Sequence, residues 1–224
     1  MFWTFLLCHL IADYPLQTDG MVQAKNTWPG LIAHVTIHLS TLLVVLFGPL
    51  GLDVGTYLPI ICAMTAAHFA IDAFKKILSQ HKSHWIIRGY ILDQFFHIVS
   101  IWLIAFWGQA LGIEPMFTIP ASWLLYASGY ILVTHVCYVT GRIVFNHDKK
   151  YQTWHQNQMW TRMVTRSVIY TAVLIGWNPL GIITGITGLL LGWYDRSDEY
   201  RWRSLFADLV TALSAIFATQ FFLS

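Results

Sequence analysis

Residues 67–72 read AHFAID and residues 92–97 read LDQFFH, and the fold follows from these two stretches. Each places a histidine and an aspartate four residues apart in an otherwise apolar run. In a helix, side chains four residues apart lie on one face, about a turn apart along the axis. Burying such groups among apolar residues is costly unless they are paired, bind a metal or line a water-filled cavity.

The same spacing occurs twice earlier in the chain, so four successive apolar segments each carry a polar pair on one stripe. The first segment has a histidine and an aspartate, and the second has two histidines. The four pairs are His9 and Asp13, His34 and His38, His68 and Asp72, and Asp93 and His97. Four pairs in succession predict one common site rather than separate accidents of packing.

The composition is that of a helical membrane protein. Of the 224 residues, 56% are hydrophobic and only 11% are charged, whereas soluble domains have about 25% charged residues. Several apolar runs approach the roughly 20 residues that a helix needs to cross a bilayer. The net charge of +2 is too small to suggest a nucleic acid as partner, which leaves the lipid bilayer and a lipid-like substrate.

Proline, glycine and polar residues divide the chain into about eight membrane segments. The sequence therefore predicts an all-α, polytopic transmembrane helix bundle. Its first segment is short or re-entrant, because Pro15 ends it early. The segments are predicted at residues 2–14, 31–47, 56–79, 85–110, 121–145, 163–177, 180–194 and 203–223. Residues 1–112 form a core that carries the polar pairs, and residues 113–224 form a supporting half.

Two connections between these segments are also given an interpretation. Residues 15–30 are predicted as a polar loop, in which Gln17 and Asp19 lie at the mouth of a cavity or form a plain solvated turn. The connection before residue 163 is predicted as a polar patch in which His155 is solvated. Gln94 lies on a different helix face from its neighbour Asp93, so it is predicted to have a packing role.

Basic residues alternate between the predicted loops. Lysine and arginine surround every second loop, whereas the loops around residues 48–55, 112–120 and 177–180 have none. By the positive-inside rule, both termini lie on the non-cytoplasmic side of a bacterial inner membrane. At a rise of about 1.5 Å per residue, all four polar pairs then fall within roughly 15 Å of the cytoplasmic surface.

Imidazole and carboxylate groups at this spacing are typical of metal sites. Zinc binds both, mixed sets also suit manganese or iron, and helix bundles build such sites from inward-facing residues. The sequence therefore predicts one or two divalent ions, most simply zinc, with the following ligands: His9, Asp13, His34, His38, His68, Asp72, Asp93 and His97.

The predicted reaction follows from such an ion. A protein-bound metal lowers the pKa of its water to about 7, which indicates hydrolysis of an ester, amide or phosphoester of a lipid-like substrate at the cytoplasmic leaflet. Asp13 and Asp93 are candidate catalytic residues, each as general base or as ligand. Some basic residues are candidates for binding an anionic head group, although the topology alone explains them: Lys25, Lys75, Lys76 and Arg88.

Two other functions use the same residues. Chains of Asp and His inside a membrane also mark proton relays, so a proton or metal-ion transporter or channel is the main alternative. Transporters are usually built from internal repeats, and the two halves of this chain show none. The third alternative is an assembly subunit whose polar core only determines how the helices pack, and this alternative predicts that no metal binds.

The motifs resemble those of a known family. Residues 9–19, HLIADYPLQTD, resemble the opening motif of bacterial and phage integral membrane proteins catalogued as a domain of unknown function. The HxxxH, HxxxD and DQxxH motifs of residues 34–97 match its following segments in order. The resemblance covers about residues 5–100, and residues 141–142 are a weak echo of it. It implies an integral membrane protein and no particular reaction. The order of His and Asp is also similar, by analogy, to that of membrane-embedded metal-dependent hydrolases.

Overall fold

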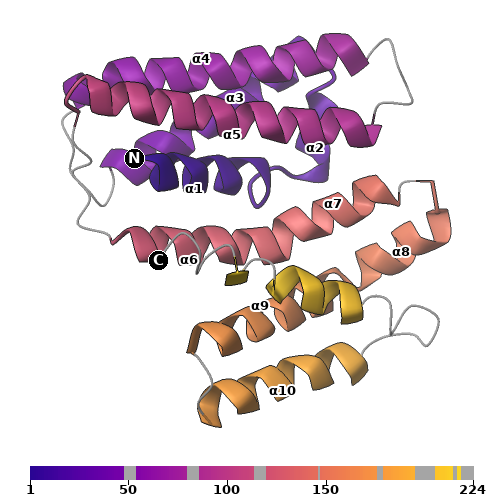
Figure 1. Cartoon of the computed structure of the whole chain (residues 1–224). Coiled ribbons are helices and arrows are strands. Elements are labelled where there is room, and N and C mark those ends of the chain that lie inside the picture. The colour runs from indigo at the N-terminus through magenta and orange to yellow at the C-terminus, as the bar shows by residue number, and fades with distance from the viewer. Residues whose placement is uncertain are drawn as a thin grey trace. The chain divides into compact units, whose positions relative to one another are not determined.

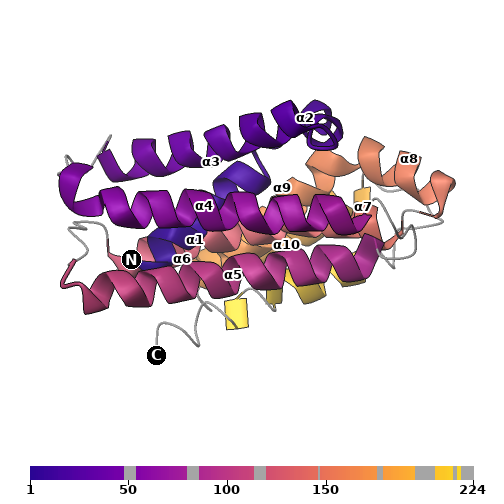
Figure 2. The ribbon, with the colours of Figure 1, turned by 90° about the horizontal axis from the view of Figure 1, so that it is seen from above.

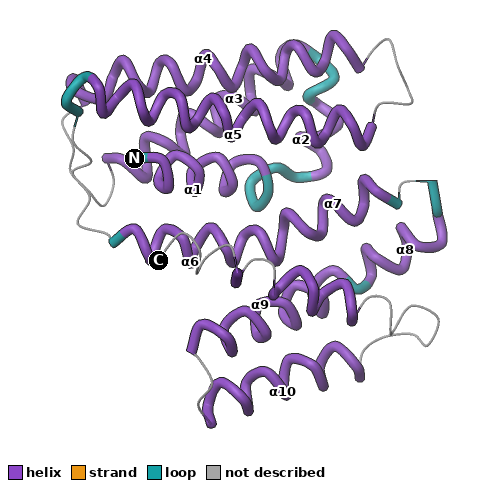
Figure 3. The backbone as a smooth tube through the Cα atoms, viewed as in Figure 1, coloured by secondary structure: helices purple, strands orange, loops and turns teal. Residues whose placement is uncertain are grey.

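The fold is all-α, as predicted, in a computed structural model of the chain (Figure 3). The structure describes residues 1–47, 54–79, 86–113, 120–145, 147–175, 179–194, 205–213 and 216–217. The chain divides into two compact units, Met1–Leu124 and Leu125–Ser224. Each unit is described by itself.

The first unit is a ring of four antiparallel helices (Figures 1 and 2). Helix α1 contacts α3 and α5, α3 also contacts α4, and α4 contacts α5. The chain therefore runs up, down, up and down around the ring. The helices of this unit are α1 (Phe2–Asp13), the short α2 (Asp19–Ala24), α3 (Trp28–Phe47), α4 (Val54–Ser79) and α5 (Ile86–Ala110).

Four stretches of helix are long and apolar enough to cross a membrane among the residues that the structure describes. They are Trp28–Val45, Gly55–Leu78, Ile86–Ala110 and Ala121–Val144. Helix α1 has only 12 residues, so it rises about 18 Å, well short of a hydrocarbon core of about 30 Å. The prediction of a short first segment is thus confirmed, and the count of eight segments stays a prediction.

Residues 15–30 are not entirely the loop that the sequence predicts, because two helices begin within them. Helix α2 begins there because Thr18 caps it, its Oγ1 accepting a hydrogen bond from the backbone N–H of Met21 at 3.3 Å. Helix α3 begins at Trp28, because Oγ1 of Thr27 accepts from the N–H of Gly30 at 3.1 Å. Proline and glycine there indicated a loop, but the first turn of a helix tolerates both, since its N–H groups have no partner within the helix.

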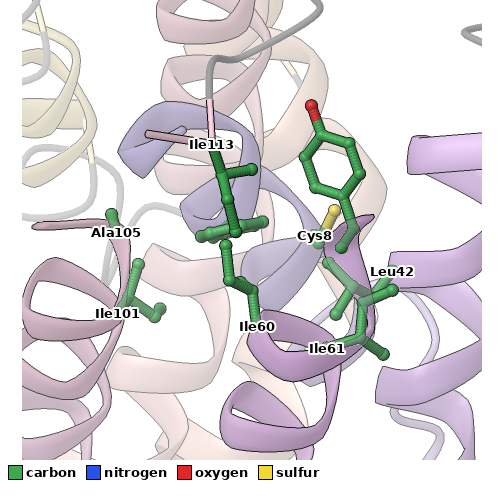
Figure 4. Packing of buried hydrophobic residues seen from close by; sticks show 9 residues of the cluster. Cys8, Leu42, Ile60, Ile61, Ile101, Ala105 and Ile113 are labelled. Carbon is green, nitrogen blue, oxygen red and sulfur yellow. The ribbon is translucent and has the colours of Figure 1, made fainter. Parts of the chain in front are cut away.

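An apolar layer lies one helical turn from the polar pairs. Phe5, Leu42 and Ile101 each lie four residues from a histidine of a pair, toward the same end of the ring. They belong to a buried cluster contributed by α1, α3, α4, α5 and the residue Ile113 after α5. Seven of its members are labelled in Figure 4: Cys8, Leu42, Ile60, Ile61, Ile101, Ala105 and Ile113. The inward stripe of each helix therefore continues from apolar packing directly into polar side chains.

The second unit contains one long helix with a wide turn and several shorter helices. Helix α6 (Ala121–Ile131), which begins in the first unit, continues through a π-helical turn (Leu132–Val136) into α7 (Cys137–Val144). The unit then has α8 (Lys149–Asn157), α9 (Met159–Ile175), α10 (Pro179–Tyr194) and a helical stretch at residues 205–213. Helix α9 packs against α10 and against the π-helical turn.

His155 was predicted to be solvated, and this prediction is wrong. It lies in α8, fully buried, and its Nε2 donates to the carbonyl oxygen of Tyr138 at 2.9 Å. A Cβ atom at Gly141 would lie 3.0 Å from Cε1 of His155, so the absence of a side chain there leaves room for the ring. The polar residues around His155 indicated a loop, but they are the outer face of a short amphipathic helix.

Candidate metal centre

The polar pairs meet at one end of the four-helix ring. Helices α1 and α4 end near the cluster, and α3 and α5 begin near it, as the up-and-down order requires (Figure 1). Seven of the eight predicted ligands are buried, and His38 is nearly so, with a side chain that is 9% exposed. The i, i+4 spacing predicted a stripe on each helix, and the fold turns the four stripes inward.

The carboxylate of Asp13 lies at the centre of the cluster. Its Oδ1 is 2.8 Å from Nε2 of His38 and 3.1 Å from Nε2 of His34. The Nε2 of His68 is 4.0 Å from the same oxygen and 3.2 Å from Nε2 of His34. These four ligand atoms, from α1, α3 and α4, all lie within 4.8 Å of one another. We call Asp13, His34, His38 and His68 the first ligand set.

The spacing of the first ligand set fits one tetrahedral ion. Zinc holds nitrogen and oxygen ligands at about 2.0–2.1 Å, which places neighbouring ligand atoms about 3.3 Å apart. Four of the six separations between these atoms, 2.8, 3.1, 3.2 and 4.0 Å, lie around that value. Three imidazole nitrogens and one carboxylate oxygen are also a donor set that zinc accepts.

Asp72 lies beside the ligand atoms of two of these histidines. Its Oδ2 is 3.3 Å from Nε2 of His34, 3.5 Å from Nε2 of His68 and 2.8 Å from Nζ of Lys25. Lys25 also donates to Oε1 of Gln17 at 3.3 Å. Gln17 therefore contacts the lysine that pairs with Asp72, and its place at a cavity mouth stays a prediction. Asp19, the other candidate for the cavity mouth, lies exposed in the first turn of α2.

Asp93 lies one layer outside the cluster. Its Oδ2 accepts a hydrogen bond from Nζ of Lys75 at 2.6 Å and another from Nε2 of Gln94 at 3.3 Å. The hydroxyl of Tyr14 donates to Oε1 of Gln94 at 3.1 Å and lies 2.9 Å from the hydroxyl of Tyr90. The packing role predicted for Gln94 is therefore corrected, because its long side chain reaches across the helix to the polar stripe.

Lys25 and Lys75 each pair with a buried carboxylate. The sequence predicts these pairs neither from membrane topology nor from binding of an anionic head group. The sequence does indicate that Lys75 faces the cluster, since it follows Asp72 by three residues and so lies on the same helix face. For Lys25, which follows the short helix α2, no local signal existed.

His9 and His97 complete the cluster on the other side of Asp13. Their rings stack with centroids 4.8 Å apart, and Nε2 of His9 is 3.5 Å from Oδ2 of Asp13. A cavity of about 20 Å³ lies among the rings of His9, His38, His68 and His97. That volume accommodates about one water molecule. The cavity therefore has four imidazole rings on one part of its wall and apolar side chains such as Phe5 and Leu42 on another part.

The comparison with known proteins concerns the part of the chain that holds this cluster. No curated protein and no solved structure matches the chain significantly. Residues 1–126 match the family described as "Protein of unknown function (DUF3307)", which confirms the resemblance to a domain of unknown function. The match includes α1 to α5 and all eight predicted ligands. Since these residues are more than half of the chain, the protein belongs to the DUF3307 family.

Proposed function

We propose that the protein is a membrane-embedded, metal-dependent hydrolase whose ion is held by the first ligand set. One observation carries this proposal: the Nε2 atoms of His34, His38 and His68 converge on one carboxylate oxygen of Asp13, at 2.8–4.0 Å. Two of these nitrogens lie at hydrogen-bonding distance from the oxygen and the third lies at 4.0 Å. Three imidazoles and one carboxylate gathered at this spacing are a ligand set that zinc accepts.

The surrounding groups support the same role. Asp72 Oδ2 lies within 3.5 Å of the Nε2 atoms of His34 and His68, so it is a further candidate ligand beside the first ligand set, and Lys25 neutralises part of its charge. Metal-binding histidines are usually oriented through their other ring nitrogen by a carboxylate or a carbonyl group. Of the two carboxylates predicted as ligand or base, Asp13 takes the ligand role. Asp93, which Lys75 holds and which stands behind His97, is a positioning residue.

The chemistry of such an ion is hydrolysis. A bound ion lowers the pKa of a water molecule to about 7 and polarises the oxygen of a carbonyl or phosphoryl group. The cavity beside His38 and His68 has the volume for that water. Because the site lies inside an apolar helical unit, the proposed substrate is a lipid-like ester, amide or phosphoester.

The basic residues support entry of the substrate from the cytoplasmic leaflet. Lys25, Lys75, Lys76 and Arg88 all belong to the end of the ring at which the cluster lies, and the loop at the other end, around residues 48–55, has no lysine or arginine. By the positive-inside rule the site end faces the cytoplasm of a bacterial inner membrane, with the N-terminus on the other side.

The experiment is elemental analysis of the detergent-purified protein beside two variants. His34→Ala removes a nitrogen from the first ligand set, and His147→Ala is a matched control, since His147 is exposed and outside the cluster. We expect the parent and the control to hold zinc, manganese or iron, and His34→Ala to bind at least about 100-fold more weakly, the upper end of what loss of an orienting residue costs. Parent and control should also hydrolyse a lipid ester, amide or phosphoester that His34→Ala leaves intact.

A folded parent with no metal above background would overturn the proposal. Circular dichroism of the helices checks that each variant is folded. Proton or metal-ion flux in liposomes would then test the transporter alternative, which uses the same residues.

A further inference from the structure

We infer that a second metal ion binds beside the first, between His9, His97 and Oδ2 of Asp13, and that this two-ion centre acts on phosphoesters. The inference rests on the proposed function, because the first ligand set supplies the neighbouring ion. It begins from two buried histidines that the first ligand set does not use. We call His9, His97 and Asp13 the second ligand set.

His97 presents a bare nitrogen to the interior. Its Nδ1 lies 2.9 Å from the carbonyl oxygen of Asp93, and since a carbonyl only accepts, Nδ1 carries the hydrogen. In a neutral ring Nε2 then has a lone pair and no hydrogen. This Nε2 is buried, on a residue that is 1% exposed, and has no hydrogen-bond partner among the described residues. A buried acceptor without a partner destabilises the folded chain, and a bound cation would offset that cost.

His9 faces the same point. Its Nε2 is buried, has no hydrogen-bond partner in the described part of the chain and lies 3.5 Å from Oδ2 of Asp13. The three ligand atoms of the second ligand set all lie within 4.8 Å of one another. A point inside such a triangle lies at most about 2.8 Å from each corner, so an inward movement of no more than about 0.7 Å per atom gives zinc distances.

The carboxylate of Asp13 joins the two ligand sets. Its Oδ1 faces His34 and His38, whereas its Oδ2 faces His9. Two-ion hydrolytic sites hold their ions about 3.5–4 Å apart, a separation that a carboxylate spans with one oxygen on each ion.

The cavity lies where both ligand sets meet. Its wall includes His38 and His68 of the first set and His9 and His97 of the second. Its volume of about 20 Å³ is sufficient for one water molecule. The reacting water would therefore lie between the two ions.

The charge of the site indicates the class of substrate. Three carboxylates, Asp13, Asp72 and Asp93, and two paired lysines, Lys25 and Lys75, leave one negative charge when the histidines are neutral. One divalent ion changes this to one positive charge, and two ions change it to three. A surplus of three positive charges at the site favours an anionic substrate, which a phosphoester supplies and an uncharged ester or amide does not.

The bond changes in such a reaction balance without a further reactant. The oxygen of water forms a bond to phosphorus while the bond from phosphorus to the ester oxygen breaks. The proton that the water loses ends on the released alcohol. A pair of ions stabilises the attacking and the leaving oxygen together.

The test counts Mn²⁺ ions on the full chain in detergent. The parent, His97→Ala and the exposed control His147→Ala are loaded with Mn²⁺ alone and analysed for bound metal and by electron paramagnetic resonance. We expect two ions per chain and an exchange-coupled signal for the parent and the control. For His97→Ala we expect one ion per chain and the six-line signal of an isolated Mn²⁺. His9→Asn is the second variant, should His97→Ala fail to fold.

The outcomes separate this inference from the proposed function. A single ion with the six-line signal in both parent and His97→Ala would overturn the second site and leave the hydrolase proposal standing. No ion in the folded parent would overturn both. Two ions in a parent that hydrolyses an uncharged lipid ester but not a phosphoester would overturn the substrate class.

Discussion

Both units of the chain bury charged side chains, and they differ in how these side chains are matched. In the second unit, Arg162 and Arg166 donate to Oδ1 of Asp208 at 3.0 and 2.7 Å, and Arg166 also donates to the carbonyl oxygen of Val133 at 3.2 Å. Arg162 further donates to Nδ1 of His155. Guanidinium donors there face acceptors of the protein itself.

In the first unit the buried polar groups at the cluster are imidazole rings and carboxylates that face one another. Nitrogens of His34 and His68 lie 3.2 Å apart, and Nε2 of His97 has no partner among the described residues. Burial of polar groups alone therefore does not distinguish a structural network from a binding site. A buried ring nitrogen without a partner does differ, because a lone pair such as that of Nε2 of His97 is one that a cation would match.

The largest effect on stability is expected in the second unit, where each buried arginine is paired with an acceptor of the protein. Asp208→Asn leaves two buried arginines without a carboxylate, so it should lower the free energy of unfolding by about 3–5 kcal/mol. Thermal unfolding in detergent, followed by circular dichroism, measures this. The metal content of the folded fraction should not change. A variant that kept full stability but lost metal would contradict the division of roles between the two units.

The second prediction concerns pH and His155, which lies in α8 outside the four apolar spans. Burial, together with the positive charge of Arg162, lowers the pKa of His155 from 6.5 to about 4. The unfolded chain binds a proton below about pH 6.5 and the folded chain does not. The stability is thus complete above pH 6.5 and falls by up to about 3 kcal/mol as the pH decreases to 4.

The measurement compares the parent with His155→Gln. Unfolding temperatures between pH 7 and pH 4 should decrease more steeply in the parent, since only the parent carries this titrating group. Equal slopes would show that another group accounts for the acid sensitivity.

The smallest effect is expected for Asp93, which lies next to the proposed ligands of the first unit without being one of them. Asp93→Asn weakens the contact with Lys75 and leaves every proposed ligand in place, so metal affinity should fall by about 10- to 100-fold. Competition with a chelator measures the affinity. Asp19→Asn is the matched control, because Asp19 is an exposed carboxylate of α2 outside the ligand sets. Equal affinities of the two variants would remove Asp93 from the centre.

The placement of the polar cluster was predictable because it depends on local geometry. A spacing of four residues determines the face of a helix, and the alternating direction of four helices determines the shared end. Both follow from the sequence, as does the apolar character of the spans. Metal binding by these residues stays a prediction.

The contacts between helices were not predictable in the same way. Lys25 reaches Asp72, and Tyr14 reaches Gln94, across positions that are far apart in the chain. No periodicity encodes such pairs, since they depend on how the helices pack. The burial of His155 was missed for the same reason, because it depends on the room beside Gly141.

The up-and-down order of the ring also has a consequence for biogenesis. The residues of the cluster are synthesised in sequence order. The first ligand set is complete once residue 68 has been added, whereas His97 is added only with α5. Nascent chains that end before α5 would thus already contain one set of four ligands with an open side toward lipid. Insertion of α5 adds the contacts with α1 and α4, and these contacts complete the ring.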